Sequence, residues 1–326
     1  MRIAIAQISP VFLDRSRTLA KVARAIDDAA AAGARLVCFG ETLVPAYPFW
    51  ICRTDGARFD APDQKRLHAA YLDQAVCIAE GHLDPIVAAA RRGRIAVVLG
   101  VAERDATRGQ TLFASRVFIG EKFDPHRRDA GGEYDILSVH RKLMPTYEER
   151  LAWGMGDGAG LQVHRVGEFT VGALNCWENW MPLPRAALYA QGEDLHVALW
   201  PGCERLTQDI TRFIARESRS FVLSAGVLLR ESDVPAGVPE RARMNLAAGE
   251  MLYDGGSCIA GPDGEWIAKP LVGREELIVA DLDRARVLEE RQNFDPAGHY
   301  SRPDVLRLTV DRTRQEGARF VEQTGG

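Results

Sequence analysis

Short apolar runs alternate with longer amphipathic stretches along most of the chain, and this alternation limits the folds that the sequence can adopt. The run RIAIAQI at 2–8 predicts a strand, and the Ala-rich stretch after it, 16–34, predicts a helix closed by Gly33. Further strands are predicted at 35–41, 94–104, 111–120, 134–142, 161–176, 195–203, 221–229, 257–270 and 276–282, with hairpin turns at Gly167 and at Asp263-Gly264. Further helices are predicted within 62–92 (broken near Gly81 and Pro85), at about 181–191 and at 205–219. Such an order of elements is typical of an α/β layered fold with helices packed outside one or two sheets.

The bulk properties exclude several classes of protein. A net charge of −4 gives no electrostatic reason to expect nucleic acid or an anionic membrane as a partner. The sequence has no run of 18 or more apolar residues, and its start lacks the features of a signal peptide. We therefore expect a cytoplasmic protein, and no linker of disordered composition divides it into two domains.

The six cysteines carry no metal-binding pattern. They form no CxxC pair, and none has a histidine at ligand spacing, so we expect no structural zinc site. In a reducing compartment scattered thiols stay free, and most are small core residues. The six are Cys38, Cys52, Cys77, Cys176, Cys203 and Cys258.

Cys176 has a setting that a core cysteine does not need. It follows the apolar run FTVGALN at 169–175 and leads into a predicted helix with Pro182 and Pro184 in or near its first turn. A thiol at such a turn faces the partial positive charge of a helix N-terminus, which favours the thiolate. The amides there also bind an anion formed after nucleophilic attack. Burial in the core is the commoner fate of a lone cysteine, so the neighbouring residues decide between the two readings.

Charged residues close two other predicted strands. Glu41 ends the strand at 35–41 and Lys142 ends the strand at 134–142, where a solvated acid and an exposed lysine are the ordinary alternatives. Glu149 either orients that lysine or lies on the surface. If Glu41, Lys142 and Cys176 meet at one sheet edge, they supply a base, a cation and a nucleophile. This combination suits attack on an electrophilic carbon bonded to nitrogen, with ammonia leaving.

Four motifs in this order resemble those of the nitrilase branch of the carbon–nitrogen hydrolase superfamily. They are FGETLVPAYPFW, HRKLMPTYEERLAWGMGDG, NCWENWMPLPR and YDGGSCIAGPDG. The resemblance extends from IAIAQISP to FDPAGHYSRPDVLRL, so we expect a carbon–nitrogen hydrolase domain at 1–308 and a C-terminal tail at 309–326. It implies a four-layer αββα sandwich whose subunits pair into a homodimer or into a larger, in some relatives spiral, homo-oligomer. The stretch 230–245 is a candidate surface for such growth.

The resemblance also implies roles for the charged residues and the thiol. Glu41 is the expected general base, Lys142 the stabilising cation, Cys176 the nucleophile and Glu149 a supporting carboxylate. The expected reaction converts a small-molecule nitrile to a carboxylic acid and ammonia through a covalent thioimidate and thioester on Cys176. No metal and no organic cofactor is required. An inactive oligomeric scaffold that has kept the fold is a remote alternative.

The substrate class rests on fewer residues. Trp177, Tyr47 and Trp200 lie beside the proposed site or at strand ends near it, and we expect them to line the substrate cavity, although aromatic residues in such places are as often plain core. The sequence CWEN favours a nitrilase, because the amidase and N-carbamoyl hydrolase branches typically carry other residues after the cysteine. Those two activities, and cyanide hydratase or dihydratase activity, remain alternatives. The glycine-rich stretch GMGDGAG does not fit the dinucleotide-binding pattern.

Overall fold

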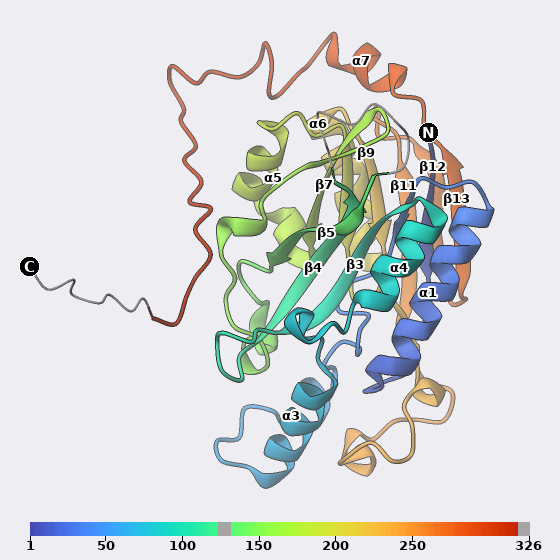
Figure 1. Ribbon diagram of the computed structural model, residues 1–326, viewed down its shortest axis with the longest axis vertical. Helices are drawn as coiled ribbons and strands as arrows, with labels where there is room; N and C mark the ends of the chain where they lie inside the picture. Colours follow the sequence, from blue (N-terminus) through green and yellow to red (C-terminus); the bar gives the residue numbers. More distant parts are fainter. Residues whose placement is uncertain (123–131, 319–326) are drawn as a thin grey trace, which may run out of the picture.

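The strands form two sheets that pack face to face, in a computed structural model that describes residues 1–122 and 132–318 (Figure 1). The first sheet has the order β13-β1-β2-β3-β4-β5. Its strands are β1 (Arg2–Gln7), β2 (Leu36–Cys38), β3 (Ala96–Arg104), β4 (Leu112–Glu121), β5 (Tyr134–Arg141) and β13 (Glu276–Asp281). β1, β2 and β3 run parallel, whereas β4, β5 and β13 join as antiparallel neighbours. The carboxyl ends of β2 and β5 therefore lie at the same edge.

The second sheet has the order β10-β11-β9-β8-β7-β6, with β12 paired to β11. Its strands are β6 (His164–Val166), β7 (Phe169–Asn175), β8 (Leu195–Leu199), β9 (Phe221–Ala225), β10 (Leu228–Arg230), β11 (Met251–Ala260) and β12 (Trp266–Val272). β7, β8 and β9 are parallel, and every residue in them is buried. Strands covered on both faces have near-continuous apolar sequences, which explains why these three were predicted from sequence.

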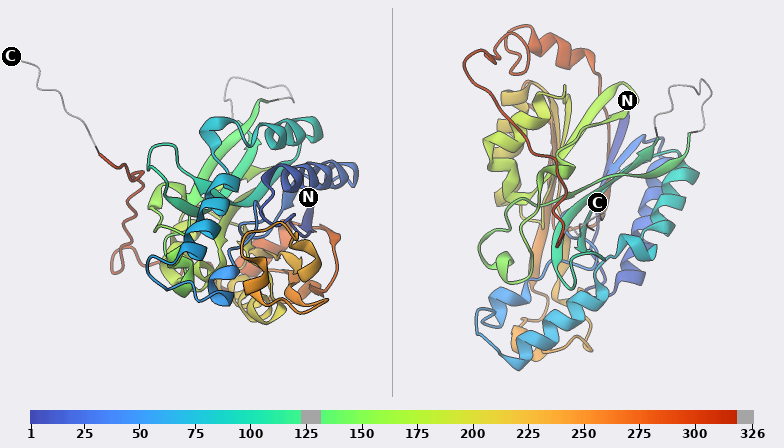
Figure 2. Two further views of the ribbon diagram at one scale, coloured as in Figure 1. Left: turned by 90° about the horizontal axis from the view of Figure 1, so that it is seen from below. Right: turned by 60° about the vertical axis from the view of Figure 1, so that its left-hand side comes forward.

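Helices cover the outer face of each sheet (Figure 2). α1 (Arg15–Ala31) and α4 (Asp84–Gly93) lie on the first sheet, and α5 (Pro182–Tyr189) and α6 (Glu204–Ser218) lie on the second. α1 begins where the Asp14 side chain accepts a hydrogen bond from the Arg17 backbone N–H at 2.9 Å, and it ends before Gly33 at φ +80°. The layer order is αββα, which confirms the expected fold class.

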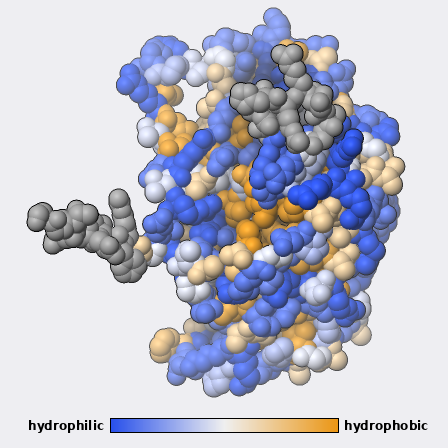
Figure 3. Space-filling view, in the orientation of Figure 1, coloured by the Kyte–Doolittle hydropathy of each residue, from blue (hydrophilic) through white to orange (hydrophobic). Residues whose placement is uncertain are grey.

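Side chains of one strand alternate between two cores. In β1, Ile3 and Ile5 pack between the sheets, whereas Ala4 and Ala6 pack in the core beneath α1 and α4. Both cores exclude water and hold the layers together through non-directional apolar contacts. Hydrophilic residues cover most of the face shown in Figure 3, and apolar residues gather near its middle.

Some elements differ from the sequence prediction. The predicted strand 221–229 is split into β9 and β10, because Gly226 passes so close to β11 that a Cβ there would lie 2.0 Å from the Gly255 carbonyl oxygen. The predicted helical stretch 62–92 breaks as expected, into α3 (Pro62–Gln74), a 3₁₀ turn and α4. Two short helices, α2 (Trp50–Arg53) and α7 (Ala285–Arg291), were not predicted.

The segments 52–62 and 230–245 lie at the same end of the molecule (Figure 1). Arg66 of α3 forms an ion pair with Glu240 at 2.8 Å, and Arg53 pairs with Glu250. The segment 230–245 is therefore held against its own chain. At the other end of the sequence, Arg314 forms an ion pair with Asp157 at 3.0 Å. A domain boundary at residue 308 remains a prediction. No helix among the described residues is long and apolar enough to cross a membrane.

Candidate active site

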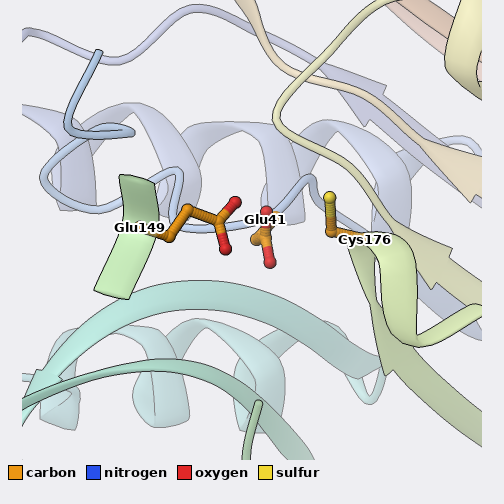
Figure 4. A group of neighbouring side chains, drawn as sticks. All are labelled: Glu41, Glu149 and Cys176. Atoms are coloured by element: carbon orange, nitrogen blue, oxygen red, sulfur yellow. The ribbon is translucent and has the colours of Figure 1, made fainter. Parts of the chain in front are cut away.

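The four sequence-predicted reactive residues follow strands of both sheets and meet at one edge. Figure 4 shows three of them, Glu41, Glu149 and Cys176. Glu41 follows β2 and Lys142 follows β5 in the first sheet, whereas Cys176 follows β7 in the second. The Glu41 backbone N–H donates to the Trp200 carbonyl oxygen at 3.0 Å, which joins the end of β2 to the end of β8. Glycine is needed at position 40, because a Cβ there would lie 2.7 Å from the same oxygen.

Lys142 lies between two carboxylates. Its Nζ is 3.0 Å from Glu41 Oε1 and 2.7 Å from Glu149 Oε2, and all three side chains are buried. Burial acts to lower the pKa of Lys142, but the nearby charges of Cys176, Glu41 and Glu149 outweigh it and raise the pKa above its usual value. The lysine therefore stays protonated at neutral pH and is the cation that the two carboxylates hold.

Glu41 has a carboxyl group that is free to exchange a proton. Among the described residues its two oxygens have no assigned hydrogen-bond partner, and Lys142 Nζ contacts Oε1 as an ion pair at 3.0 Å. Burial raises the pKa of Glu41 to about 8, with the Glu149 charge adding to the rise and Lys142 opposing it. A carboxyl group with a pKa near the working pH is well suited to general acid–base catalysis.

Cys176 is the first residue of a 3₁₀ helix, Cys176–Trp180, and has a backbone φ of +47°. The helix predicted at about 181–191 is confirmed as α5, which begins at Pro182. The 3₁₀ helix lies between it and the thiol, so Cys176 is not placed at the N-terminus of α5. Burial raises the pKa of the Cys176 thiol, whereas the Lys142 charge and the Trp177 backbone N–H lower it. Lys142 is therefore the main group that favours the thiolate. Sγ and carboxylate oxygens of Glu41 and Glu149 lie within 4.8 Å of one another.

Glu149 connects the lysine to a neighbouring turn and to Tyr47. In the 3₁₀ helix Tyr147–Leu151, Glu149 forms a capping box with Thr146, whose backbone N–H donates to Oε2 at 2.6 Å. Lys142 donates to the same oxygen, and the Tyr47 hydroxyl donates to Oε1 at 2.9 Å. Both oxygens of Glu149 are thus hydrogen-bonded, which fixes its position relative to Lys142.

The predicted substrate-binding aromatics lie in different surroundings. Tyr47 reaches the site, and its ring packs edge-on against Trp153 at 5.5 Å and Tyr253 at 5.6 Å between centroids. Trp200 is fully buried in the same apolar cluster as Cys176. Trp177 is 45% exposed, and its contact is with another surface indole, that of Trp180, at 6.1 Å between centroids.

Tyr253 was missed by the sequence reasoning. It lies within β11, and its ring packs against that of Tyr47, whose hydroxyl donates to Glu149. Burial raises the pKa of the Tyr253 hydroxyl. The motif YDGGSCIAGPDG contains this tyrosine. The other reactive residues follow the ends of strands, whereas Tyr253 lies near the start of β11.

Comparison of the sequence with known proteins identifies a family in keeping with this geometry. The family model for carbon–nitrogen hydrolases matches residues 2–292. The chain belongs to this family. Two similar proteins are an aliphatic nitrilase of Rhodococcus rhodochrous, 33% identical over 100% of this chain and 83% of that protein, and a bifunctional nitrilase/nitrile hydratase NIT4A of Lupinus angustifolius, 36% identical over 95% and 86%. The resemblance of the motifs to the nitrilase branch is thereby confirmed.

Solved structures of family members share the fold. A carbon–nitrogen hydrolase from Helicobacter pylori G27 aligns over 93% of this chain and 96% of its own, with a TM-score of 0.67 at 19% identity. An amidase from Nesterenkonia sp. aligns over 90% and 94%, with a TM-score of 0.59 at 21% identity. At these identities the likeness concerns the fold alone.

Proposed function

We propose that this carbon–nitrogen hydrolase is a nitrilase, which converts an organic nitrile to the carboxylic acid and ammonia. The observation that carries the proposal is the buried group of Cys176, Lys142, Glu41 and Glu149, which supplies a nucleophile, a cation and a base with a pKa of about 8. Relatives that are named nitrilases, and that align over more than four-fifths of their length, support the choice of a nitrile over other carbon–nitrogen substrates.

The first half of the reaction forms a covalent intermediate. The Glu41 carboxylate takes the thiol proton while Sγ of Cys176 bonds to the nitrile carbon. The developing negative charge on nitrogen faces the buried Lys142 ammonium, which stabilises it. The proton then passes from Glu41 to this nitrogen, and the product is a neutral thioimidate.

The second half consumes two waters. Glu41 takes a proton from the first water, whose oxygen bonds to the thioimidate carbon, and passes this proton to the nitrogen. The hydroxyl proton of the tetrahedral species then moves to the nitrogen by way of Glu41, ammonia leaves as the C–N bond breaks, and a thioester remains. The second water attacks the thioester in the same way, so that the C–S bond breaks and Cys176 regains its proton. If the tetrahedral species breaks its C–S bond before the C–N bond, the product is the amide.

The experiment that tests the proposal measures ammonia release from aliphatic, aromatic and arylacetonitriles and from the matching amides, for the wild type and Cys176→Ala. We expect nitrile turnover in the wild type and none in the variant, with unchanged circular dichroism because alanine fills the same buried position. Turnover of amides alone would assign the chain to an amidase or N-carbamoyl activity. Turnover of cyanide, without turnover of the nitriles or the amides, would indicate a cyanide hydratase or dihydratase.

We further propose that the subunits self-associate through the outer face of α5 and α6. Large apolar side chains are exposed there and in the adjoining 3₁₀ helix, namely Trp177, Trp180, Leu183 and Phe213. Exposed apolar patches of this kind mark contact surfaces. Sedimentation of the wild type and of Leu183→Glu tests this idea, since a charge on this face should yield smaller species. A location in the cytoplasm remains a prediction from the sequence.

A further inference from the structure

The reactive group is assembled across the contact between two sheets. Glu41, Lys142 and Glu149 follow strands of the first sheet, and Cys176 follows a strand of the second. The distance from the Lys142 ammonium to the thiol therefore depends on how the sheets are held at this edge. Apolar packing between sheets is non-directional, so directional bonds are needed to fix the two chain segments relative to each other.

Glu178 makes such bonds. Its Oε1 accepts the backbone N–H of Leu143 at 2.6 Å, and its Oε2 accepts the backbone N–H of Asn175 at 3.0 Å. Leu143 is the residue after Lys142, and Asn175 is the residue before Cys176. His140 Nε2, on β5, lies 3.1 and 3.2 Å from the two oxygens. One carboxylate thus joins the backbone beside the lysine to the backbone beside the nucleophile.

We propose that Glu178 is a positioning residue that sets the placement of Cys176 relative to Lys142. It touches neither the thiol nor the ammonium, and it acts through the two backbone segments that carry them. The expected effect of Glu178 on turnover rests on the proposed nitrilase function. The expected effect of Glu178 on the reactivity of the Cys176 thiol is independent of that function.

The bonding requires an ionised carboxylate of this length. Each oxygen accepts a backbone N–H, so the amide of a glutamine would direct its own N–H₂ against one of these donors. An aspartate, which is shorter by one CH₂, would not span both. Burial acts to raise the pKa of Glu178, but His140 and the backbone N–H groups of Leu143 and Asn175 outweigh it and hold the pKa below its usual value. The side chain is 1% exposed, so water does not replace a lost bond.

A matched control lies beside the start of β7, the strand whose other end leads to Cys176. The buried Asp194 accepts the backbone N–H of Thr170, near the start of β7, at 2.6 Å, and it forms an ion pair with Arg284 at 2.7 Å. Asp194→Asn removes the same kind of buried charge and weakens the same kind of bond to β7. It does so at the end of β7 opposite to Cys176. Asp194→Asn should therefore change the stability of the protein without moving the thiol of Cys176.

The test compares Glu178→Gln, Glu178→Asp and Asp194→Asn with the full-length wild type. Iodoacetamide labelling is followed by peptide mass spectrometry, with the exposed Cys52 as an internal reference for reagent and time. In both Glu178 variants we expect the ratio of Cys176 to Cys52 labelling to fall at least about fivefold. We also expect kcat on the best nitrile to fall at least about tenfold, near 1.4 kcal/mol of barrier, with KM within about threefold. Asp194→Asn should keep the ratio and kcat within about twofold.

The outcomes separate the inference from the proposed function. A lower labelling ratio in a protein that hydrolyses no nitrile would support the role of Glu178 and reject the nitrilase. A ratio and kcat within twofold of the wild type in folded Glu178→Gln would overturn the role of Glu178. Equal losses in Asp194→Asn, or failure of both Glu178 variants to fold, would assign Glu178 to general stability and overturn it as well.

Discussion

Two short 3₁₀ turns carry the reactive region, and they are built alike. One is Tyr147–Leu151, which follows β5, and the other is Cys176–Trp180, which follows β7. Each begins with a residue in the left-handed region, Tyr147 at φ +45° and Cys176 at φ +47°. Each also has a capping box that is closed by a glutamate at its third helical position.

The two turns use these shared parts differently. The glutamate of the first turn, Glu149, directs its remaining bonds to the Lys142 ammonium and the Tyr47 hydroxyl, and so brings charge to the site. The glutamate of the second turn, Glu178, directs its remaining bonds to a backbone N–H and to His140, away from the thiol. The same capping box can therefore change the charge of a site or fix its geometry, depending on the group that the remaining carboxylate oxygen contacts.

Replacement of Glu41, which belongs to neither turn, should have the largest effect. Glu41→Gln removes the proposed base, and we expect turnover to fall by about 10²–10⁴-fold. In the wild type, kcat/KM should rise with pH through about 8, the pKa of the Glu41 carboxyl group. Ammonia release across pH 5–10 checks both statements. A variant that retains at least a tenth of the wild-type rate would show that another group takes the thiol proton.

Glu41→Gln should also change how stability depends on pH. The folded protein holds this proton up to pH about 8, whereas the unfolded chain releases it near the ordinary carboxyl pKa of 4.5. The stability that the protonated group contributes is therefore fully present below pH 4.5 and is lost as the pH rises to about 8. Each pH unit corresponds to about 1.4 kcal/mol. Between pH 4.5 and 8, the free energy of unfolding of the variant, measured with urea, should rise by a few kcal/mol relative to that of the wild type. Parallel curves of unfolding free energy against pH would contradict this.

Glu149→Gln and Glu178→Gln should separate charge from geometry. A glutamine at 149 can keep its oxygen towards Lys142 and Thr146 and donate its N–H₂ to the Tyr47 hydroxyl, so the geometry survives while the charge is lost. Because the Glu149 charge raises the pKa of Glu41, the rise of kcat/KM should move to lower pH. We expect a loss in kcat of about tenfold, the scale of one hydrogen bond to a charged group.

The pH profile of kcat/KM checks this contrast. In Glu178→Gln the same rise should move less, because Glu178 contributes least among the charges that affect Glu41. The loss in that variant should come instead from displaced backbone. A larger shift in Glu178→Gln than in Glu149→Gln would reverse the assignment of the two turns.

Much of the fold could be predicted from sequence, for a physical reason. Strands covered on both faces, such as β7 and β8, are nearly continuous apolar runs, and α1 shows a helical period over 17 residues. α2 and α7 have only four and seven residues, too few for a period to be distinct. The division between β9 and β10 depends on the close approach of Gly226 to β11, which is a tertiary contact and leaves no local pattern.

The site could be predicted where chemistry coincides with a strand end. Glu41, Lys142 and Cys176 each follow a strand, and the shared edge of the sheets brings them together. Tyr253 and Glu178 were not predicted as residues of the site. Tyr253 is placed by the pairing of β11 in the second sheet, and the role of Glu178 depends on a contact between the sheets, which no segment of sequence contains.

The smallest predicted effect concerns the first residue of each turn. A non-glycine residue in the left-handed region costs roughly 1–2 kcal/mol, and at Cys176 this conformation presents the thiol beside Lys142 and Glu41. Tyr147 has the same conformation, but its side chain is 76% exposed. Tyr147→Gly should therefore raise the free energy of unfolding by about 0.5–1 kcal/mol, after the greater loss of chain entropy at glycine, and leave kcat unchanged. Urea unfolding and ammonia release measure the two quantities. A loss of activity would contradict this prediction. It would mean that the side chain of Tyr147 is needed to keep Glu149 in its capping box and the first turn in its active conformation.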